Sequence, residues 1–255
     1  MHTEQSLAAD IRALGVTPTD LLTVHTSLKK VGTIDTSQKS GAEVLIDALR
    51  SCVSDGVLMI PAHTFRNVRE TPVFDIRRTM PCIGAVPCVA VEMANRAVDA
   101  GDPTCVRSLH VSHSVVAFGA RAQEFVQGDR IGRTRTPMTG SYGKLYYENG
   151  KILLLGVDLT CNTFIHAIDE VLYSVTDEIV PITVTDYDGS TWVHAQHATS
   201  GPASASFERY RGALEKNGAV TYGKVGDADA MLIDARKCFG VVAYMQTVMP
   251  EPIDP

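Results

Sequence analysis

Several features that would indicate a membrane or disulfide-rich protein are missing from this sequence. No apolar run approaches the roughly 18 residues that a bilayer-spanning helix needs. The N-terminal residues include Glu4 and Asp10 and do not form the apolar core of a signal peptide. The six cysteines are scattered and form no CxxC pair. We therefore expect a cytoplasmic protein that has no membrane partner and whose cysteines, Cys161 among them, are mostly buried thiols.

The chain also lacks an excess of positive charge. Its net charge is −6, which argues against a nucleic-acid partner and is compatible with a cationic small molecule. Hydrophobic residues make up 45% and charged residues 20% of the sequence, as in ordinary globular proteins. A chain of 255 residues has enough material for one large core, so we expect a single domain over residues 1–255.

Hydrophobic patterns predict an alternation of strands and helices. Residues 179–186 and 191–196 alternate around Asp188-Gly189, which predicts a β-hairpin, and Ser40 is a plausible N-cap for the helix that follows it. The order of elements predicts an α/β fold with a mixed, largely parallel central sheet flanked by helices, and an antiparallel hairpin in the C-terminal half. The predicted strands are 21–26, 57–60, 114–118, 151–157 and 230–233, and the predicted helices are 3–14, 41–53, 83–96, 142–148, 207–216 and 237–248, with one more after residue 162.

The segment after the predicted strand 151–157 has the composition of a catalytic site. A helix that begins near residues 162–163 places His166 in its first turns, where α/β proteins position reactive groups. Asp169 and Glu170 follow three and four residues later and can share a helix face with the histidine. A carboxylate favours the charged imidazole, so we expect a general base with a pKa above the ordinary value of about 6.5.

Two further segments are rich in groups that bind phosphate. Hydroxyls and two lysines lie in residues 24–32, which lack the glycine spacing of a P-loop or a dinucleotide fingerprint. An arginine, three serines and two histidines lie in residues 107–114, and arginine is suited to bidentate phosphate contacts. For the first segment, an ordinary polar turn with solvated lysines is the alternative interpretation.

His110 and His113 have the H-x-x-H spacing of some metal sites. On a strand this spacing would direct the two rings to opposite faces, and no third ligand lies nearby in sequence. We therefore expect no metal. A metal-dependent hydrolase that combines these two residues with His63 and His166 remains open as an alternative function.

Taken together, these segments resemble the aminoglycoside 3-N-acetyltransferase family, a group of coenzyme-A-dependent antibiotic acetyltransferases. No single match is very specific, but the matches occur in the same order as in the family, from about residue 21 to the C-terminus. The matching segments are 24–28 with Gly32, Gly41-Ala42, Met59-Ile60-Pro61, Phe74-Asp75, Ile83-Gly84, 107–110, His113-Ser114, 141–145, 154–157, 162–166 and 223–228.

The resemblance implies a role for each matching residue. His166 corresponds to the family's catalytic histidine, with Asp169 or Glu170 orienting it, and His63 and Asp169 would face the acceptor amine. The amine would attack acetyl-coenzyme A directly, with His166 as general base and no acyl-enzyme. The residues implied for the coenzyme are His25, Thr26, Ser27, Leu28, Lys30, Arg107, Ser108, His110 and Ser114.

The chain departs from the family pattern on the acceptor side. Residues 62–65 read Ala-His-Thr-Phe where members commonly read Thr-Phe-Thr, and Thr160 stands where many aminoglycoside-active members have aspartate. Residues 132–140 are unusually basic for a site that binds a polycation. The implied function is acetyl transfer to an amine of a small molecule, foremost the 3-amino group of an aminoglycoside. A non-catalytic coenzyme A binder is a further alternative.

Overall fold

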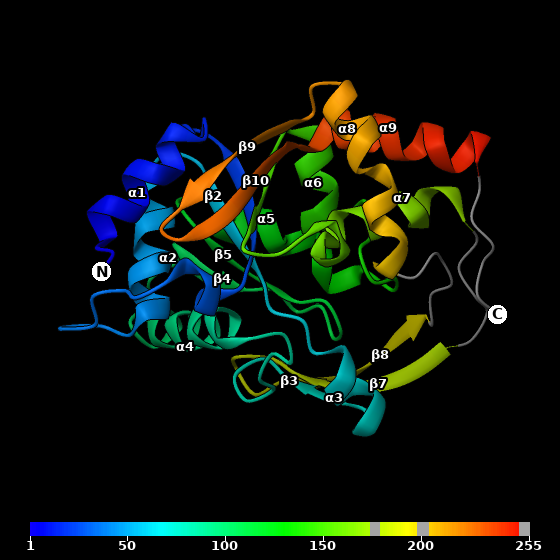
Figure 1. The fold of residues 1–255 in the computed structure, drawn as a ribbon. Coiled ribbons are helices and arrows are strands. Elements are labelled where there is room, and N and C mark those ends of the chain that lie inside the picture. Colours follow the sequence, from blue (N-terminus) through cyan, green and yellow to red (C-terminus); the bar gives the residue numbers. More distant parts are fainter. Residues whose placement is uncertain (174–178, 198–203, 250–255) are drawn as a thin grey trace.

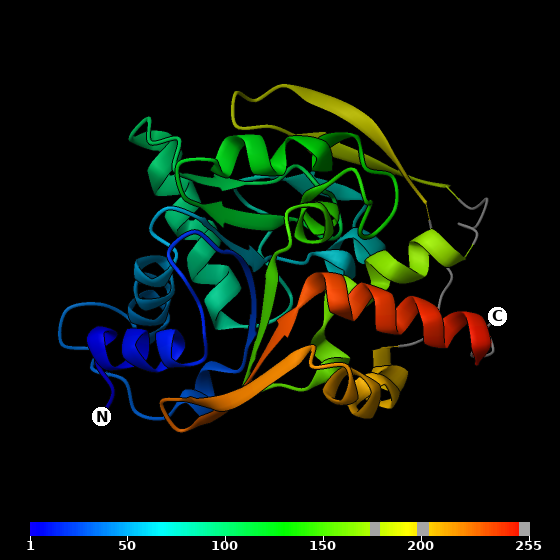
Figure 2. The same ribbon diagram turned by 90° about the horizontal axis from the view of Figure 1, so that it is seen from above.

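The computed structural model describes residues 1–173, 179–197 and 204–249, and a seven-stranded sheet forms the centre of this part (Figure 1). The order across the sheet is β4-β5-β2-β1-β6-β10-β9. Helix α1 (Glu4–Ala13) and the last turns of α9 (Ala235–Val248) lie on opposite sides of the molecule in Figures 1 and 2. The strands are β1 (Leu21–Thr26), β2 (Val57–Pro61), β4 (Cys105–Arg107), β5 (Val115–Phe118), β6 (Lys151–Leu155), β9 (Val220–Val225) and β10 (Ala228–Asp234).

The mixed α/β class is confirmed, but parallel pairing is confined to the middle of the sheet. β1 pairs in parallel with both β2 and β6. The pairs β2–β5, β4–β5, β6–β10 and β9–β10 are antiparallel. The sheet is less parallel than we expected, because β4–β5 and β9–β10 are joined by short connections. A short connection reverses the chain, whereas parallel neighbours need a long crossover.

Helices cover both faces of the sheet, because successive side chains of the central strands point to opposite sides. Leu22 and Val24 of β1 belong to one apolar cluster, and Leu21 belongs to the other. None of the described helices is long and apolar enough to cross a membrane. The first face is covered by α1 (Glu4–Ala13), α2 (Gly41–Cys52) and α4 (Ala85–Asp99). The second face is covered by α5 (Ala122–Val126), α6 (Ser141–Tyr147), α7 (Thr163–Leu172), α8 (Arg211–Lys216) and α9 (Ala235–Val248).

Local sequence signals set several of these boundaries. The Ser40 side chain accepts a hydrogen bond from the backbone N–H of Glu43 at 3.2 Å, and the Glu43 carboxylate accepts one from the Ser40 N–H at 3.2 Å. This reciprocal capping box confirms the predicted start of α2. The predicted helix over 207–216 begins instead as a 3-10 helix, η4 (Ser204–Tyr210), and continues as α8.

The predicted C-terminal hairpin is present, but it belongs to a second, three-stranded sheet. β7 (Ile179–Thr185) and β8 (Thr191–His197) pair antiparallel, and β3 (Val73–Asp75) adds to β7 in parallel. Gly189 in the connecting turn has a φ of 82°, which favours glycine. Phe74, Ile182 and Val184 form part of a separate apolar cluster. In Figures 1 and 2 this sheet lies on the opposite side of the molecule from β9 and β10.

A buried arginine joins the two sheets. Arg107 is 1% exposed, and its Nη1 donates a hydrogen bond to the carbonyl of Ile76 at 2.8 Å. Its Nε and Nη2 both donate to the hydroxyl of Ser114 at 3.2 Å, and that hydroxyl donates to the carbonyl of Ala62 at 2.7 Å. The guanidinium lies 5.0 Å from the ring centre of Phe74. Burial lowers the pKa of Arg107 to about 10. These contacts tie β4 and β5 to the segments that follow β2 and β3.

We expect Arg107→Ala to destabilise the protein, because it removes several buried hydrogen bonds and leaves a cavity. The free energy of unfolding should fall by roughly 2–4 kcal/mol, measured by urea denaturation. Arg78→Ala is the matched control, since the Arg78 side chain is 88% exposed and, among the described residues, its guanidinium makes a long contact of 3.8 Å to Asp75. Equal stability of the two variants would contradict this role for Arg107.

Candidate active site

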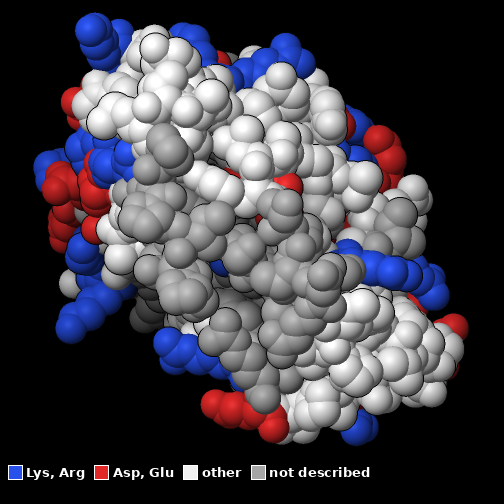
Figure 3. Space-filling model, turned by 90° about the vertical axis from the view of Figure 1, so that its right-hand side faces the viewer, with Lys and Arg blue, Asp and Glu red and all other residues white. Residues whose placement is uncertain are grey.

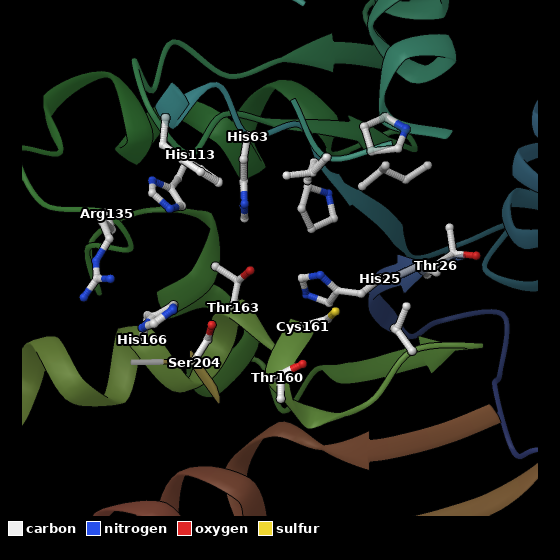
Figure 4. A pocket seen from close by; sticks show the side chains of 17 residues that line it. His25, Thr26, His63, His113, Arg135, Thr160, Cys161, Thr163, His166 and Ser204 are labelled. Atoms are coloured by element: carbon white, nitrogen blue, oxygen red, sulfur yellow. The ribbon is translucent and has the colours of Figure 1, made fainter. Parts of the chain in front are cut away.

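A pocket of about 390 Å³ opens where the three parallel strands end. His25 and Thr26 come from the end of β1, and His63 comes from the segment that follows β2. Thr163 and His166 come from the first turns of α7, after β6. The carboxyl ends of parallel strands meet at one edge of a sheet, so the fold brings together residues that are distant in sequence. Figure 4 shows these side chains around the pocket.

His166 sits where the sequence placed it, near the start of a helix that Asn162 caps. The Asn162 side chain accepts a hydrogen bond from the backbone N–H of Phe164 at 3.2 Å. The His166 side chain is 13% exposed, and its ring lies 4.8 Å from that of Phe207. Its Nδ1 lies 3.4 Å from Oδ2 of Asp169. Both atoms are buried, and neither makes a hydrogen bond to a described residue, so the two are in close contact without a formed hydrogen bond.

The pKa of His166 differs in direction from the expectation. Burial lowers it, and this effect outweighs the opposite influence of Asp169, while the charge of Arg135 lowers it further. The expectation of a raised pKa was therefore wrong. Sequence showed the carboxylate but did not show how far the ring is removed from water, and desolvation disfavours the charged imidazole.

The two candidate carboxylates point in different directions. Asp169 is 0% exposed and contacts His166. The Oε1 atom of Glu170 instead accepts a hydrogen bond from the backbone N–H of Thr136 at 3.0 Å and lies 3.9 Å from Nε of Arg135. Burial raises the pKa of Glu170. The geometry therefore assigns the contact with the histidine to Asp169, and Glu170 anchors the loop that carries Arg135 over the pocket.

Three more imidazoles line the pocket. The ring centres of His63 and His113 are 4.5 Å apart, and Nε2 of His63 lies 2.9 Å from the hydroxyl of Tyr142. Burial lowers the pKa of His25 to about 4 and holds those of His63 and His113 well below the ordinary value. The three rings are therefore neutral near pH 7, and they present hydrogen-bonding atoms rather than charge.

The H-x-x-H segment is a turn and not a strand, which corrects the expectation that its rings diverge. The rings of His110 and His113 lie 6.1 Å apart. Nδ1 of His110 accepts the backbone N–H groups of Ser112 and His113, and Nε2 lies 2.6 Å from the carbonyl of Thr134. Both nitrogens of His110 are thus occupied by the protein. Within the residues that the structure describes, no group of three or more His, Cys, Asp or Glu side chains could hold a metal ion.

The residues implied for the coenzyme fall into two groups. Nε2 of His25 and Oγ1 of Thr26 line the pocket and have no hydrogen-bond partner among the described residues. The next three do not line it: Ser27 donates its N–H to the Leu155 carbonyl at 2.9 Å, Leu28 begins the 3-10 helix η1 (Leu28–Val31), and Lys30 is exposed. Polar atoms that remain unpaired when buried are available to a ligand.

The second group, from residues 107–114, lies away from the pocket. Arg107 and Ser114 form the buried junction described above, and Ser108 accepts the backbone N–H of Val115 at 3.0 Å through its hydroxyl. Arg107, Ser108, His110 and Ser114 are all buried, and none of them lines the pocket. These side chains form their hydrogen bonds with other parts of the protein and not with a ligand. A composition rich in arginine and serine does not distinguish these two uses.

Some pocket residues were not among the predicted site residues. Arg135, Thr160 and Ser204 line the pocket, and so does Cys161, which is exposed and not the buried thiol that we expected. The basic character of residues 132–140 was the signal for Arg135. Figure 4 shows Arg135, His113 and His166 toward one end of the pocket, with Thr26 toward the other. The pocket thus has one end rich in imidazole and guanidinium nitrogens and another lined by hydroxyl and apolar groups.

Comparison with known proteins gives a consistent picture. A family model described as aminoglycoside 3-N-acetyltransferase matches residues 23–247. Aminoglycoside N(3)-acetyltransferase III of Serratia marcescens is 32% identical over 187 residues, which are 65% of this chain and 63% of the relative, less than two thirds of its length. The protein of the same name from a Salmonella species is 29% identical over 282 residues, covering 100% of this chain and 96% of the relative. The solved structure of AAC-IIIb in binary complex with CoASH has a TM-score of 0.78 at 23% identity and covers 98% of this chain and 99% of that one. Because the family model spans most of the sequence, the chain belongs to the aminoglycoside 3-N-acetyltransferase family.

Proposed function

We propose that this protein transfers an acetyl group from acetyl-coenzyme A to an amine of a small molecule, with the 3-amino group of an aminoglycoside as the first acceptor to test. Membership of the family and the likeness to AAC-IIIb, which was solved with CoASH, support this reaction. The observation that carries the proposal is the pair formed by His166 and the buried Asp169 at the edge of the pocket.

In the proposed mechanism His166 acts as a general base. Its Nδ1 faces the Asp169 carboxylate, which can only accept a hydrogen bond, so the Nδ1 atom carries the proton and Nε2 is left as the acceptor. Amines of the lysine type have a pKa near 10.4 and attack only when deprotonated. Nε2 takes the proton as the amine nitrogen bonds to the thioester carbon. The carbon–sulfur bond then breaks, and the protonated His166 gives the proton to the departing sulfur, which releases the thiol and the amide and restores the neutral base.

The remaining groups would bind and orient the two substrates. The unpartnered polar atoms of His25 and Thr26 suit the amide and carbonyl groups of the pantetheine arm. The oxyanion that forms at the thioester carbonyl needs hydrogen-bond donors. The backbone N–H of Thr163 is a candidate, because the first N–H groups of a helix have no acceptor within the helix. No acyl-enzyme is needed. Although Cys161 is exposed, partial desolvation of its thiol raises the pKa, which makes it a poor nucleophile.

We expect acetyl-coenzyme A to stabilise the protein against heat. A ligand at 100 times its dissociation constant adds about 2.7 kcal/mol to the free energy of unfolding. A thermal-shift titration measures this effect, and a thiol-release assay with aminoglycosides and simpler amines distinguishes an enzyme from a non-catalytic coenzyme binder. No shift at millimolar acetyl-coenzyme A would reject the proposal, and a shift without thiol release from any amine would favour the binder.

His166→Ala should lower kcat by ~10² or more and leave the dissociation constant of acetyl-coenzyme A nearly unchanged. The reason is that the base takes part in proton transfer and not in holding the coenzyme. Isothermal titration and steady-state kinetics give the two quantities. A well-folded variant that binds the coenzyme and retains full turnover would end the general-base assignment.

Asp169→Asn should move the acid limb of the kcat/KM profile to lower pH. Burial already holds the pKa of His166 below its ordinary value, and Asp169 is the group that opposes this effect. A base works only when unprotonated, so the wild-type rate should fall only below a pH of about 6.5 and that of the variant at still lower pH. The ionisation of the acceptor is common to both proteins and cancels in the comparison. A shift to higher pH would contradict this interpretation.

A further inference from the structure

A glutamine from the C-terminal helix reaches the carboxylate that contacts His166. Gln246 lies on α9 and is 4% exposed. Its Nε2 donates a hydrogen bond to Oδ1 of Asp169 at 3.2 Å and another to the hydroxyl of Tyr210. Its Oε1 accepts a hydrogen bond from the hydroxyl of Tyr173 at 2.6 Å. Since a carboxylate can only accept, the amide nitrogen must face Asp169, and the network fixes the orientation of the amide.

Asp169 needs such a partner because it is completely buried. A buried carboxylate is costly unless donors compensate for the lost water. Gln246 supplies a donor to Oδ1, while the other oxygen, Oδ2, lies 3.4 Å from Nδ1 of His166 and has no hydrogen-bond partner among the described residues. A carboxylate is planar, so holding Oδ1 also sets the direction in which Oδ2 points. The position of Gln246 therefore determines whether Oδ2 faces the imidazole.

We propose that Gln246 is a positioning residue for the reaction, because it holds Asp169 so that the carboxylate directs His166. The proposal rests on the proposed role of His166 as general base. Gln246 does not line the pocket, so it reaches His166 through its neighbours, and Asp169 is the hydrogen-bond partner that contacts the imidazole. Its removal should therefore impair turnover and leave substrate binding intact.

The placement of α9 gives this contact its rigidity. α9 begins directly after β10 and packs with α7 in the same apolar cluster, so both helices rest on the second face of the sheet. Tyr210 belongs to that cluster and is fully buried, so one neighbour of the amide is itself held by the core. Figure 3 shows the side of the molecule toward which α7 and α9 run in Figure 1, with charged side chains mostly near the edges of the view. Gln246 lies beneath the surface, between helices, and not on it.

The test is Gln246→Met, which keeps the size of the side chain and removes its hydrogen-bonding groups. We expect kcat to fall between about tenfold and a hundredfold, as when a catalytic group is slightly misplaced. The KM values and the affinity for acetyl-coenzyme A should not change. Thr247→Val is the matched control on the same helix, since Thr247 is exposed and, among the described residues, its hydroxyl bonds to the Ala243 carbonyl four residues earlier. Its kcat should equal that of the wild type.

A double-mutant cycle separates positioning from a general structural role. If Gln246 acts through the Asp169 carboxylate, Gln246→Met should lower kcat much less in an Asp169→Asn background than in the wild type. Tyr173→Phe, which removes the hydrogen bond from the Tyr173 hydroxyl to the Gln246 carbonyl oxygen, should lower kcat less but in the same direction. Tyr173→Phe keeps the aromatic ring, so it can be used to test the proposal if Gln246→Met does not fold.

Several outcomes would overturn the proposal. A folded Gln246→Met protein with wild-type kcat, or equal losses of kcat in both backgrounds of the cycle, would show that Gln246 does not act through Asp169. Wild-type kcat in Tyr173→Phe would do the same if the methionine variant does not fold. An inactive His166→Ala beside a fully active Gln246→Met would reject this inference alone. Full turnover by His166→Ala would reject the proposed general base and, with it, the role of Gln246.

Discussion

The parallel pairing of β2, β1 and β6 is the constraint on which the candidate site depends. Parallel strands end at the same edge of a sheet, and the registered pairs reach Thr26 beside Leu155 at that edge. His25 lies at the end of β1, and His63 and His166 come after β2 and β6, yet all three line one pocket. A slip of the register by one residue would turn each strand over and send His25 to the opposite face. The chemistry of the pocket is therefore set first by backbone hydrogen bonding and only then by side chains.

Burial, more than charge, sets the protonation of the pocket. At His166 two effects oppose each other, since Asp169 favours the charged ring and desolvation disfavours it, and desolvation is the larger. This balance suits a base. An imidazole with a strongly raised pKa would already carry a proton near pH 7 and could not accept one. In the proposed mechanism the buried carboxylate serves mainly to fix which ring nitrogen is protonated, and this does not require a large shift of the pKa.

Elements with a strong local sequence signal were predictable. Features that depend on contacts with residues distant in sequence were not. The bounds of β1, the cap of α2 and the place of His166 follow from hydrophobic period and capping residues. Asp169 and Glu170 are adjacent on one helix, and only Gln246 and the loop at Thr136 separate their roles. The short strands β3 and β4 have too few residues to show a period. The segment that contains Arg107 has the composition of a phosphate site, and only its complete burial identifies it as a structural junction.

The residues around the proposed base come from the whole length of the chain. His63 follows β2, His166 and Asp169 lie on α7, and Gln246 is near the end of α9. Contacts between residues so far apart in sequence form only when the intervening chain has folded, because each must offset the entropy of closing a long loop. The docking of α9 on α7 is therefore part of building the site and not only of covering the sheet. In the proposed mechanism, a substitution that loosens α9 would impair turnover without touching the pocket, because the Asp169 carboxylate would transmit the change to His166.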